Sequence, residues 1–229
     1  MPFWEEEIKL AVPSNEVLEA MVAAVGKGTR DHSYRDVYKD SADHQLLKHG
    51  LALRERTQGG ERRVELKGAG TSSQGVVCRP EWQQVLLGEL TGCLDLAEGP
   101  VRSRVLEILT PQTPLLPLFR CLISRRSLTL PVSDLGLVEI SFDHGEVCTD
   151  QRQVEIREVE VELLAGSREA AIVLADDLAQ RFGLTVAGPS KFLVGLTLLG
   201  WKGAQFPIQA IPDFDRLSLH PDGTSFFSW

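Results

Sequence analysis

The chain has 229 residues, of which 43% are hydrophobic and 24% are charged, a composition typical of soluble globular proteins. The formal net charge of −8 and the lack of any run of five Lys or Arg residues argue against a nucleic-acid-binding surface. No stretch of 18 apolar residues occurs, so we expect no membrane span. The N-terminus lacks a secretory signal and the four cysteines are widely spaced, so we expect free thiols and a cytoplasmic location.

Hydrophobic periodicity and turn residues divide the sequence into many strands and a few helices. In chain order they predict a strand at 5–12, a helix at 14–25, a strand at 34–40, a helical turn at 41–49, strands at 51–57, 62–68 and 75–82, a helical region at 82–110, strands at 118–130, 135–143 and 154–164, and a helix at 167–182. Consecutive strands joined by short turns favour an antiparallel sheet or barrel, hence an α+β fold that is mainly antiparallel β. Residues 203–229 are assigned no element.

Several predicted strands carry charged residues at alternate positions, which places those residues on one face of each strand. These sets are Glu5, Glu7 and Lys9; Arg54 and Arg56; Glu65 and Lys67; Arg79 and Glu81; Glu139, Ser141 and Asp143; and Glu158, Glu160 and Glu162. One such face is typical of a strand whose outer side is solvated. Three neighbouring glutamates repel one another unless cations neutralise them, and both signs recur on six strands. This pattern favours a closed barrel with a charged interior.

A charged tunnel of this kind would suit a polyphosphate bound together with metal ions. Carboxylate oxygens are hard ligands that suit Mg²⁺ or Mn²⁺. Lysine and arginine suit phosphate oxygens, and the guanidinium group can bind two of them at once. Phosphoryl transfer depends mostly on positioning and charge neutralisation, which these groups can provide.

The sequence resembles the CYTH superfamily, the triphosphate tunnel metalloenzymes. Glu5-Glu6-Glu7-Ile8-Lys9 is similar to the Glu-x-Glu-x-Lys signature of that family. Further similar segments follow in the family's order: Tyr38-Lys39-Asp40-Ser41, Leu51-Ala52-Leu53-Arg54-Glu55-Arg56, Glu65-Leu66-Lys67-Gly68, Arg79-Pro80-Glu81-Trp82, Ser124-Arg125-Arg126-Ser127, the strands around Asp143 and Glu160, and Gly188-Pro189-Ser190-Lys191. The most similar branch is the CYTH domain of bacterial inorganic triphosphatases. The resemblance implies an eight-stranded closed barrel with flanking helices over residues 1–202. The remaining tail, 203–229, is rich in proline and aromatic residues, and we expect it to pack on the barrel or on a partner.

The resemblance and the strand faces together suggest roles for individual residues. The expected metal ligands are Glu5, Glu7, Asp143, Glu158, Glu160 and Glu162, with Mg²⁺ or Mn²⁺ as the cofactor. The expected phosphate-binding residues are Lys9, Arg54, Arg56, Lys67, Arg79, Arg126 and Lys191. Lys9 and Glu160 are the expected catalytic residues. Strand alternation suggests that Arg126 points inward and Arg125 outward, whereas Arg79 and Glu81 could instead pair with each other.

The implied activity is metal-dependent hydrolysis of a triphosphate, with inorganic tripolyphosphate as the first choice of substrate. The family also contains class IV adenylate cyclases and thiamine triphosphatases, so these two activities are the alternatives, with ATP or thiamine triphosphate as the ligand. A non-catalytic module that binds polyphosphate or a nucleotide is a third possibility, because Ser141 replaces a second Asp found in some relatives. The sequence indicates no nucleic-acid or membrane partner, and we expect a monomer or a homodimer.

Overall fold

The computed structural model describes residues 2–25, 28–186 and 189–201. Its strands are β1 (Phe3–Ala11), β2 (Arg30–Asp40), β3 (Ala52–Gln58), β4 (Glu61–Lys67), β5 (Thr71–Ser73), β6 (Val76–Val85), β7 (Leu116–Val132), β8 (Gly136–Cys148), β9 (Gln153–Gly166) and β10 (Thr185–Val186). Its helices are α1 (Asn15–Val25), α2 (Gln45–Lys48), the short 3₁₀ helix η1 (Cys93–Asp95), α3 (Pro100–Leu106), α4 (Arg168–Phe182) and α5 (Lys191–Leu198). The tail predicted at 203–229 lies outside the described residues, as does Gly188.

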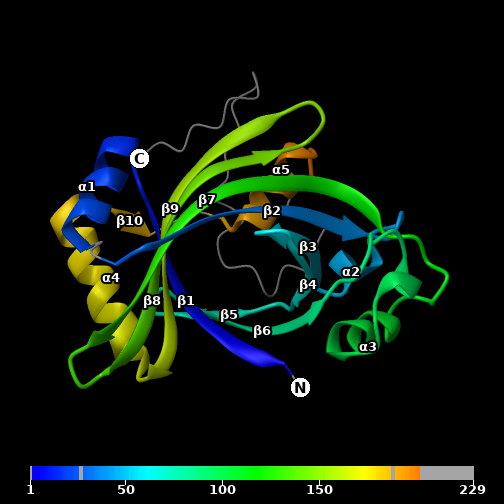
Figure 1. Ribbon diagram of the computed structural model, residues 1–229, viewed down its shortest axis with the longest axis horizontal. Helices are drawn as coiled ribbons and strands as arrows, with labels where there is room; N and C mark the ends of the chain where they lie inside the picture. The colour runs from blue at the N-terminus through cyan, green and yellow to red at the C-terminus, as the bar shows by residue number, and fades with distance from the viewer. Residues whose placement is uncertain (1, 26–27, 187–188, 202–229) are drawn as a thin grey trace.

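Eight antiparallel strands close into a barrel in the order β1-β9-β8-β7-β2-β3-β4-β6 (Figure 1). The ring closes because β6 pairs back onto β1, with Glu5 opposite Arg79. The short strands β5 and β10 extend β6 and β1 outside this ring. The prediction of a closed, eight-stranded antiparallel barrel with flanking helices is confirmed.

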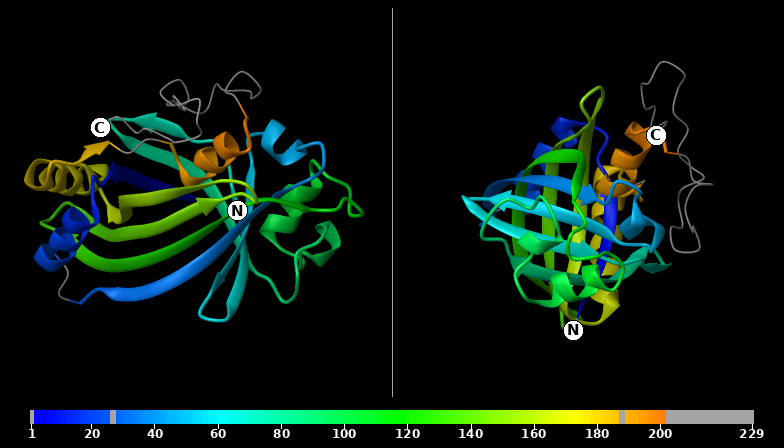
Figure 2. Two further views of the ribbon diagram at one scale, coloured as in Figure 1. Left: turned by 90° about the horizontal axis from the view of Figure 1, so that it is seen from above. Right: turned by 90° about the vertical axis from the view of Figure 1, so that its right-hand side faces the viewer.

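The outer faces of the strands are apolar where helices cover them. At one end of the molecule, α1 and α4 lie against β1, β8 and β9, and the buried residues there include Ile8, Ile140, Phe142 and Val159 (Figure 2). At the other end, α3 covers the outer face of β3, β4 and β6, burying residues such as Leu66. Because strand residues alternate between faces, packing the apolar residues outward turns their charged neighbours inward.

The helix ends follow the signals in the sequence. The Ser14 hydroxyl accepts a hydrogen bond from the Val17 backbone at the start of α1, and Ser167 accepts one from Glu169 at the start of α4. Helix α4 ends at Gly183, which adopts the left-handed conformation with φ 67°. These two helices confirm the sequence prediction closely.

The helical prediction for residues 82–110 was largely wrong. Strand β6 continues to Val85, and the rest of that region contains only η1 and the seven-residue helix α3. The spacing of Val85, Leu86 and Leu90 resembles a helix, but Gly92 and Gly99 interrupt the segment before Pro100 begins α3. Helix α5 and the short strands β5 and β10 were not predicted.

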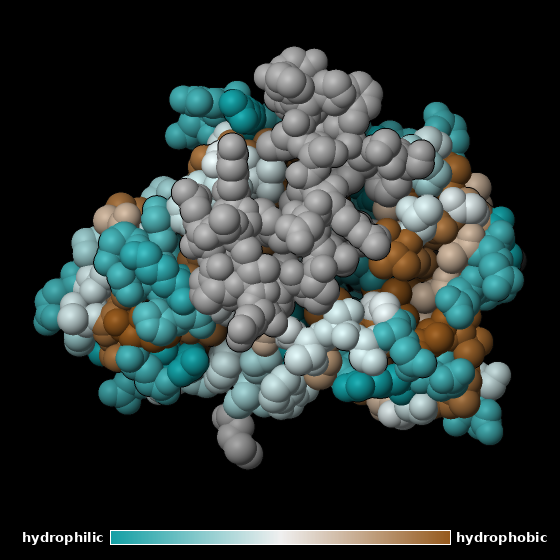
Figure 3. All heavy atoms as spheres, turned by 180° about the vertical axis from the view of Figure 1, so that it is seen from behind, coloured by the Kyte–Doolittle hydropathy of each residue, from teal (hydrophilic) through white to brown (hydrophobic). Residues whose placement is uncertain are grey.

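Seen from behind, the molecular surface is a mixture of hydrophilic and hydrophobic residues, with the hydrophobic ones in separate patches (Figure 3). Among the described residues, no helix combines the length and apolarity needed to cross a bilayer.

Candidate functional site

The inner face of the barrel surrounds a cavity of about 760 Å³. Charged side chains of both signs line it: Glu5, Glu7, Lys9, Arg54, Arg56, Arg63, Glu65, Lys67, Arg79, Glu81, Arg125, Glu139, Glu160, Glu162 and Lys191. The alternating charges in the sequence therefore mark the interior of the barrel rather than a solvated outer face.

The two signs of charge are distributed unevenly around the ring of strands. The carboxylates that we call the acidic wall come from β1, β8 and β9: Glu5, Glu7, Glu139, Asp143, Glu158, Glu160 and Glu162. The cations that we call the basic wall come from β3, β4 and β6: Arg54, Arg56, Arg63, Lys67 and Arg79. Each wall also carries the opposite charge, with Lys9 on β1 and Glu65 and Glu81 on β4 and β6, but carboxylates predominate on one side and cations on the other. A ligand in the cavity would thus meet mainly oxygen ligands for metal on one side and mainly cationic donors on the other.

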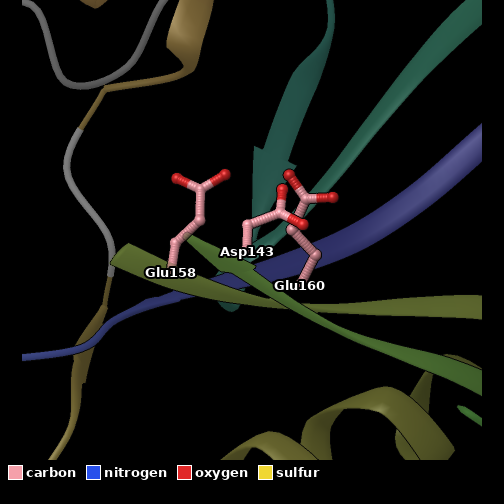
Figure 4. A group of neighbouring side chains, drawn as sticks. All are labelled: Asp143, Glu158 and Glu160. Carbon is pink, nitrogen blue, oxygen red and sulfur yellow. The ribbon is translucent and has the colours of Figure 1, made fainter. Parts of the chain in front are cut away.

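Three carboxylates of the acidic wall form a tight group. One oxygen from each of Asp143, Glu158 and Glu160 lies within 4.8 Å of the other two, and all three residues are buried. Figure 4 shows their side chains projecting from neighbouring strands toward a common region. The register explains the grouping, because Asp143 on β8 lies opposite Glu158 on β9, with Glu160 two residues further along the same face.

Three cations hold this group together. The Lys191 ammonium lies 2.7 Å from Asp143 and 3.1 Å from Glu160, and it also contacts Glu158. Lys9 donates to Glu160 at 2.6 Å. Arg125 donates to both oxygens of Asp143, at 2.5 and 2.6 Å, and also contacts Glu160.

Burial and these cations act in opposite directions on the carboxylates. Burial disfavours the ionised form of Glu160, but the three neighbouring cations outweigh it and hold its pKa well below the usual range. The same balance lowers the pKa of Asp143. Burial raises the pKa of Glu158, and the charges of Glu160 and Asp143 add to that shift. The group therefore has one carboxyl that accepts a proton more easily than its neighbours.

A second set of carboxylates lies further along the acidic wall. The two oxygens of Glu5 each accept a bond from Lys67 at 2.8 Å, and Arg79 donates to Glu5 at 2.6 Å. Arg79 also contacts Glu7. Glu162 lies opposite Glu7 and makes no ion pair with any described residue. Burial, with the charges of Glu5 and Glu7, raises the pKa of Glu162 to about 7.

Buried carboxylates also orient the basic wall. Asp36, fully buried on β2, accepts two hydrogen bonds from Arg56, at 2.7 and 2.6 Å, and one from Arg54 at 3.3 Å. Arg54 also donates to Glu65 at 2.5 Å. The sequence analysis did not select Asp36. The sequence could have indicated Asp36, because it lies two residues from Tyr34 and Tyr38 and four from Asp40, all on the same face of β2.

Arg79 and Glu81 share a face, as predicted, but do not pair with each other. Arg79 binds Glu5 and Glu7, while Glu81 lies 2.9 Å from Lys67.

The predicted orientations of Arg125 and Arg126 were reversed. Arg126 lies on the outer face and pairs with Glu19 of α1 at 2.6 Å, whereas Arg125 lies inside the barrel. Alternation along β7 could not decide between them, because Phe119, Cys121 and Ile123 make the inner face as apolar as the outer one. The inward cation of this strand is therefore Arg125.

Helix α5 enters the barrel at one end and brings Lys191 to the acidic wall. Its apolar residues pack against inward side chains of β2, β7, β8 and β9. The approach is close at Gly195, where an added Cβ would lie 2.2 Å from the Phe119 ring. The Ser190 hydroxyl caps the helix by accepting a bond from the Leu193 backbone at 3.3 Å. The sequence indicated Lys191 but not the helix that positions it.

The sequence that forms this charged barrel interior matches a known protein family over most of its length. The model of the CYTH domain matches residues 4–193. The chain belongs to the CYTH family. The family membership predicted from the sequence is confirmed.

Similar proteins support the same fold. The inorganic triphosphatase of Haemophilus influenzae is 28% identical over 167 residues, or 73% of this chain and 46% of that protein. The chain thus spans about half the length of this relative. Among solved structures, HpAC1 from Hippeastrum, a putative adenylyl cyclase described as having a dominant triphosphatase activity, superimposes with a TM-score of 0.68 at 19% identity. It aligns with 84% of this chain and 95% of its own. A putative adenylate cyclase from Bacillus halodurans gives a TM-score of 0.56 at 21% identity over 82% of this chain and 95% of its own.

Proposed function

We propose that the barrel binds inorganic tripolyphosphate together with Mg²⁺ or Mn²⁺ and hydrolyses it. The observation that carries this proposal is the opposition of an acidic and a basic wall across one cavity. A triphosphate carries several negative charges and would bring divalent cations with it, so it complements both walls at once. The name of the Haemophilus influenzae relative supports the choice of the inorganic substrate.

The residues of the acidic wall fit a divalent cation. Asp143, Glu158 and Glu160 offer three hard oxygen ligands within 4.8 Å of one another. Burial raises the pKa of Glu162 to about 7, and the charges of Glu5 and Glu7, which a cation would neutralise, add to that shift. A bound Mg²⁺ or Mn²⁺ would neutralise charge on the phosphate oxygens and lower the pKa of a coordinated water.

The cations of the cavity would bind the phosphate oxygens. Arg54, Arg56, Lys67 and Arg79 belong to the basic wall and now donate to carboxylates. Phosphate oxygens can replace those carboxylate acceptors, because guanidinium and ammonium groups bind both anions with similar geometry. We assign the same role to Lys9, Lys191 and Arg125 on the other side of the cavity, with Arg125 in place of Arg126.

We assign two residues to the attacking water, Glu160 and Lys9. Glu160 accepts hydrogen bonds from Lys9 and Lys191, at 2.6 and 3.1 Å, which keep it ionised and able to accept a hydrogen bond from water. Lys9 lies between Glu160 and Glu7, which is 3.6 Å away. Its ammonium group could therefore stabilise the negative charge that develops on the phosphoryl oxygens during attack.

A substrate panel tests the proposal. Phosphate release would be measured from tripolyphosphate, ATP and thiamine triphosphate with Mg²⁺ and with Mn²⁺, and products formed from ATP would be checked for cyclic AMP. We expect tripolyphosphate to be cleaved with the highest kcat/KM and no cyclic AMP to form. Cleavage of none of the three would reject the hydrolase. Tight tripolyphosphate binding without turnover would instead favour a binding module, in which Ser141 leaves the acidic wall one ligand short.

A further inference from the structure

Tyr34 lies where the two sides of the cavity meet. It is on the inner face of β2, buried to 4% exposure, between the neighbouring strands β3 and β7. Its hydroxyl donates to Asp143 Oδ2 at 3.2 Å. The central guanidinium carbon of Arg56 stacks over its ring, 3.8 Å from the ring centroid. A single side chain thus contacts a carboxylate of the acidic wall and a cation of the basic wall.

The partners of Asp143 differ in charge, which decides which of them can remain when a cation binds. Arg125 and Lys191 are positively charged and occupy both of its oxygens. A divalent cation on the same carboxylate would repel both of these groups at short range. The Tyr34 hydroxyl is neutral under ordinary conditions, since a phenol ionises near pH 10. Among the described residues that contact the Asp143 carboxylate, Tyr34 is therefore the donor that a bound cation would not repel.

The ring of Tyr34 has a separate effect on the basic side. Arg56 is held at its edge by Asp36 and at its face by the Tyr34 ring, so the plane of the guanidinium is fixed. Arg125 lies near the same ring, with its guanidinium carbon 5.4 Å from the centroid. The ring therefore lies against two cations and helps to set the direction in which Arg56 presents its donors.

We propose that Tyr34 is a positioning residue that orients Asp143 toward a bound divalent cation through its hydroxyl and holds Arg56 toward the phosphates through its ring. The inference rests on the proposed metal-dependent function of this cavity. Removing a group that hydrogen-bonds to a metal ligand and orients it commonly lowers metal affinity by about 10- to 100-fold.

The two contacts can be separated by two substitutions. Tyr34→Phe removes the hydroxyl and keeps the ring, so we expect Mn²⁺ affinity to fall about 10- to 100-fold while the KM for tripolyphosphate changes less than about threefold. Tyr34→Leu also removes the ring, so KM should rise a further three- to tenfold, roughly the range of a cation–π contact. Mn²⁺ binding would be followed by electron paramagnetic resonance of the free ion, which requires no turnover.

Tyr38→Phe is the matched control for the metal readout, because Tyr38 lies on the same face of β2 and is equally buried, but its ring stacks on Phe119 and its hydroxyl contacts Arg54 rather than a carboxylate of the acidic wall. It should leave Mn²⁺ affinity unchanged. Equal Mn²⁺ affinity in the wild type and Tyr34→Phe, with only a lower melting temperature in the variant, would mean that Tyr34 merely packs and would overturn the inference. A wild-type protein that binds no Mn²⁺, with or without tripolyphosphate, would overturn the proposed function as well.

Discussion

Replacing Glu160 with glutamine removes one charge from the most crowded part of the cavity and nearly keeps the shape of the side chain. Glu160 interacts with Lys9, Lys191 and Arg125. Its lowered pKa means that ionised Glu160 favours the folded state, an effect present above its unfolded pKa near 4.5 and lost as the pH falls toward the folded value. Without that charge, the three buried cations keep only Asp143, Glu158 and, for Lys9, Glu7 as partners, so we expect the metal-free protein to lose about 3 kcal/mol of stability at pH 7.

The same substitution should also affect function. We expect Mn²⁺ affinity to fall and kcat for tripolyphosphate to drop by about 10²- to 10³-fold, the usual scale for losing an electrostatic contact in a water-poor site. Urea unfolding at pH 7 and phosphate release would measure the two effects.

Glu155→Gln is the matched control on the same strand. Glu155 is about half exposed on the outer face, where it contacts His144 and Arg157. That variant should change stability by less than about 0.5 kcal/mol and leave kcat unchanged. Similar behaviour of the two glutamine variants would refute the assignment of this face of β9 to the catalytic cavity.

Three other expectations follow from single observations. Arg125→Ala should lower kcat/KM by about 100-fold or more and Arg126→Ala by less than about threefold, since one arginine lies inside the barrel and the other outside; equal losses would contradict that placement. Burial and two nearby carboxylates raise the pKa of Glu162 to about 7, so the folded state favours the protonated form of this residue. Protonated Glu162 therefore stabilises the protein below about pH 4.5, and this stabilisation is lost as the pH rises through 7. The free energy of unfolding in urea should therefore fall less with rising pH in Glu162→Gln than in the wild type, with a difference in slope of at most about 1.4 kcal/mol per pH unit. Parallel plots of unfolding free energy against pH for the variant and the wild type would argue against the raised pKa. Gly195→Ala should cost about 1–3 kcal/mol because its Cβ would overlap a buried ring, whereas Gly88→Ala, with open space around it, should cost far less; thermal melts of both variants would show whether α5 packs this closely.

The barrel could be predicted from the sequence because its strands have one consistent pattern. Glu158, Glu160 and Glu162 alternate with buried valines, and the apolar neighbours pack outward under α1 and α4. A strand with one apolar face and one charged face leaves a single choice once the apolar face is covered. The spacing of these glutamates therefore predicted that they lie on the inner face of the barrel, as the structure has them, while their role toward metal stays a prediction.

The parts that could not be predicted depend on contacts between distant segments. Strand β7 has apolar residues on both faces, so its alternation could not tell whether Arg125 or Arg126 points inward. Helix α5 is short and mostly apolar after Lys191, and its packing against Phe119 inside the barrel explains why it forms there. The role of Asp36 depends on two arginines 18 and 20 residues away, which no local pattern joins to it.

The most direct test of the account is a crystal structure with Mn²⁺ and the non-hydrolysable imido analogue of tripolyphosphate. We expect anomalous density for manganese against Asp143, Glu158 and Glu160 or against Glu5, Glu7 and Glu162. The analogue should lie between those ions and the basic wall, with Arg56 and Lys67 on its oxygens. Manganese bound away from these carboxylates, or the analogue bound on the outer surface of the barrel, would contradict the central claim that the two walls together form the triphosphate site.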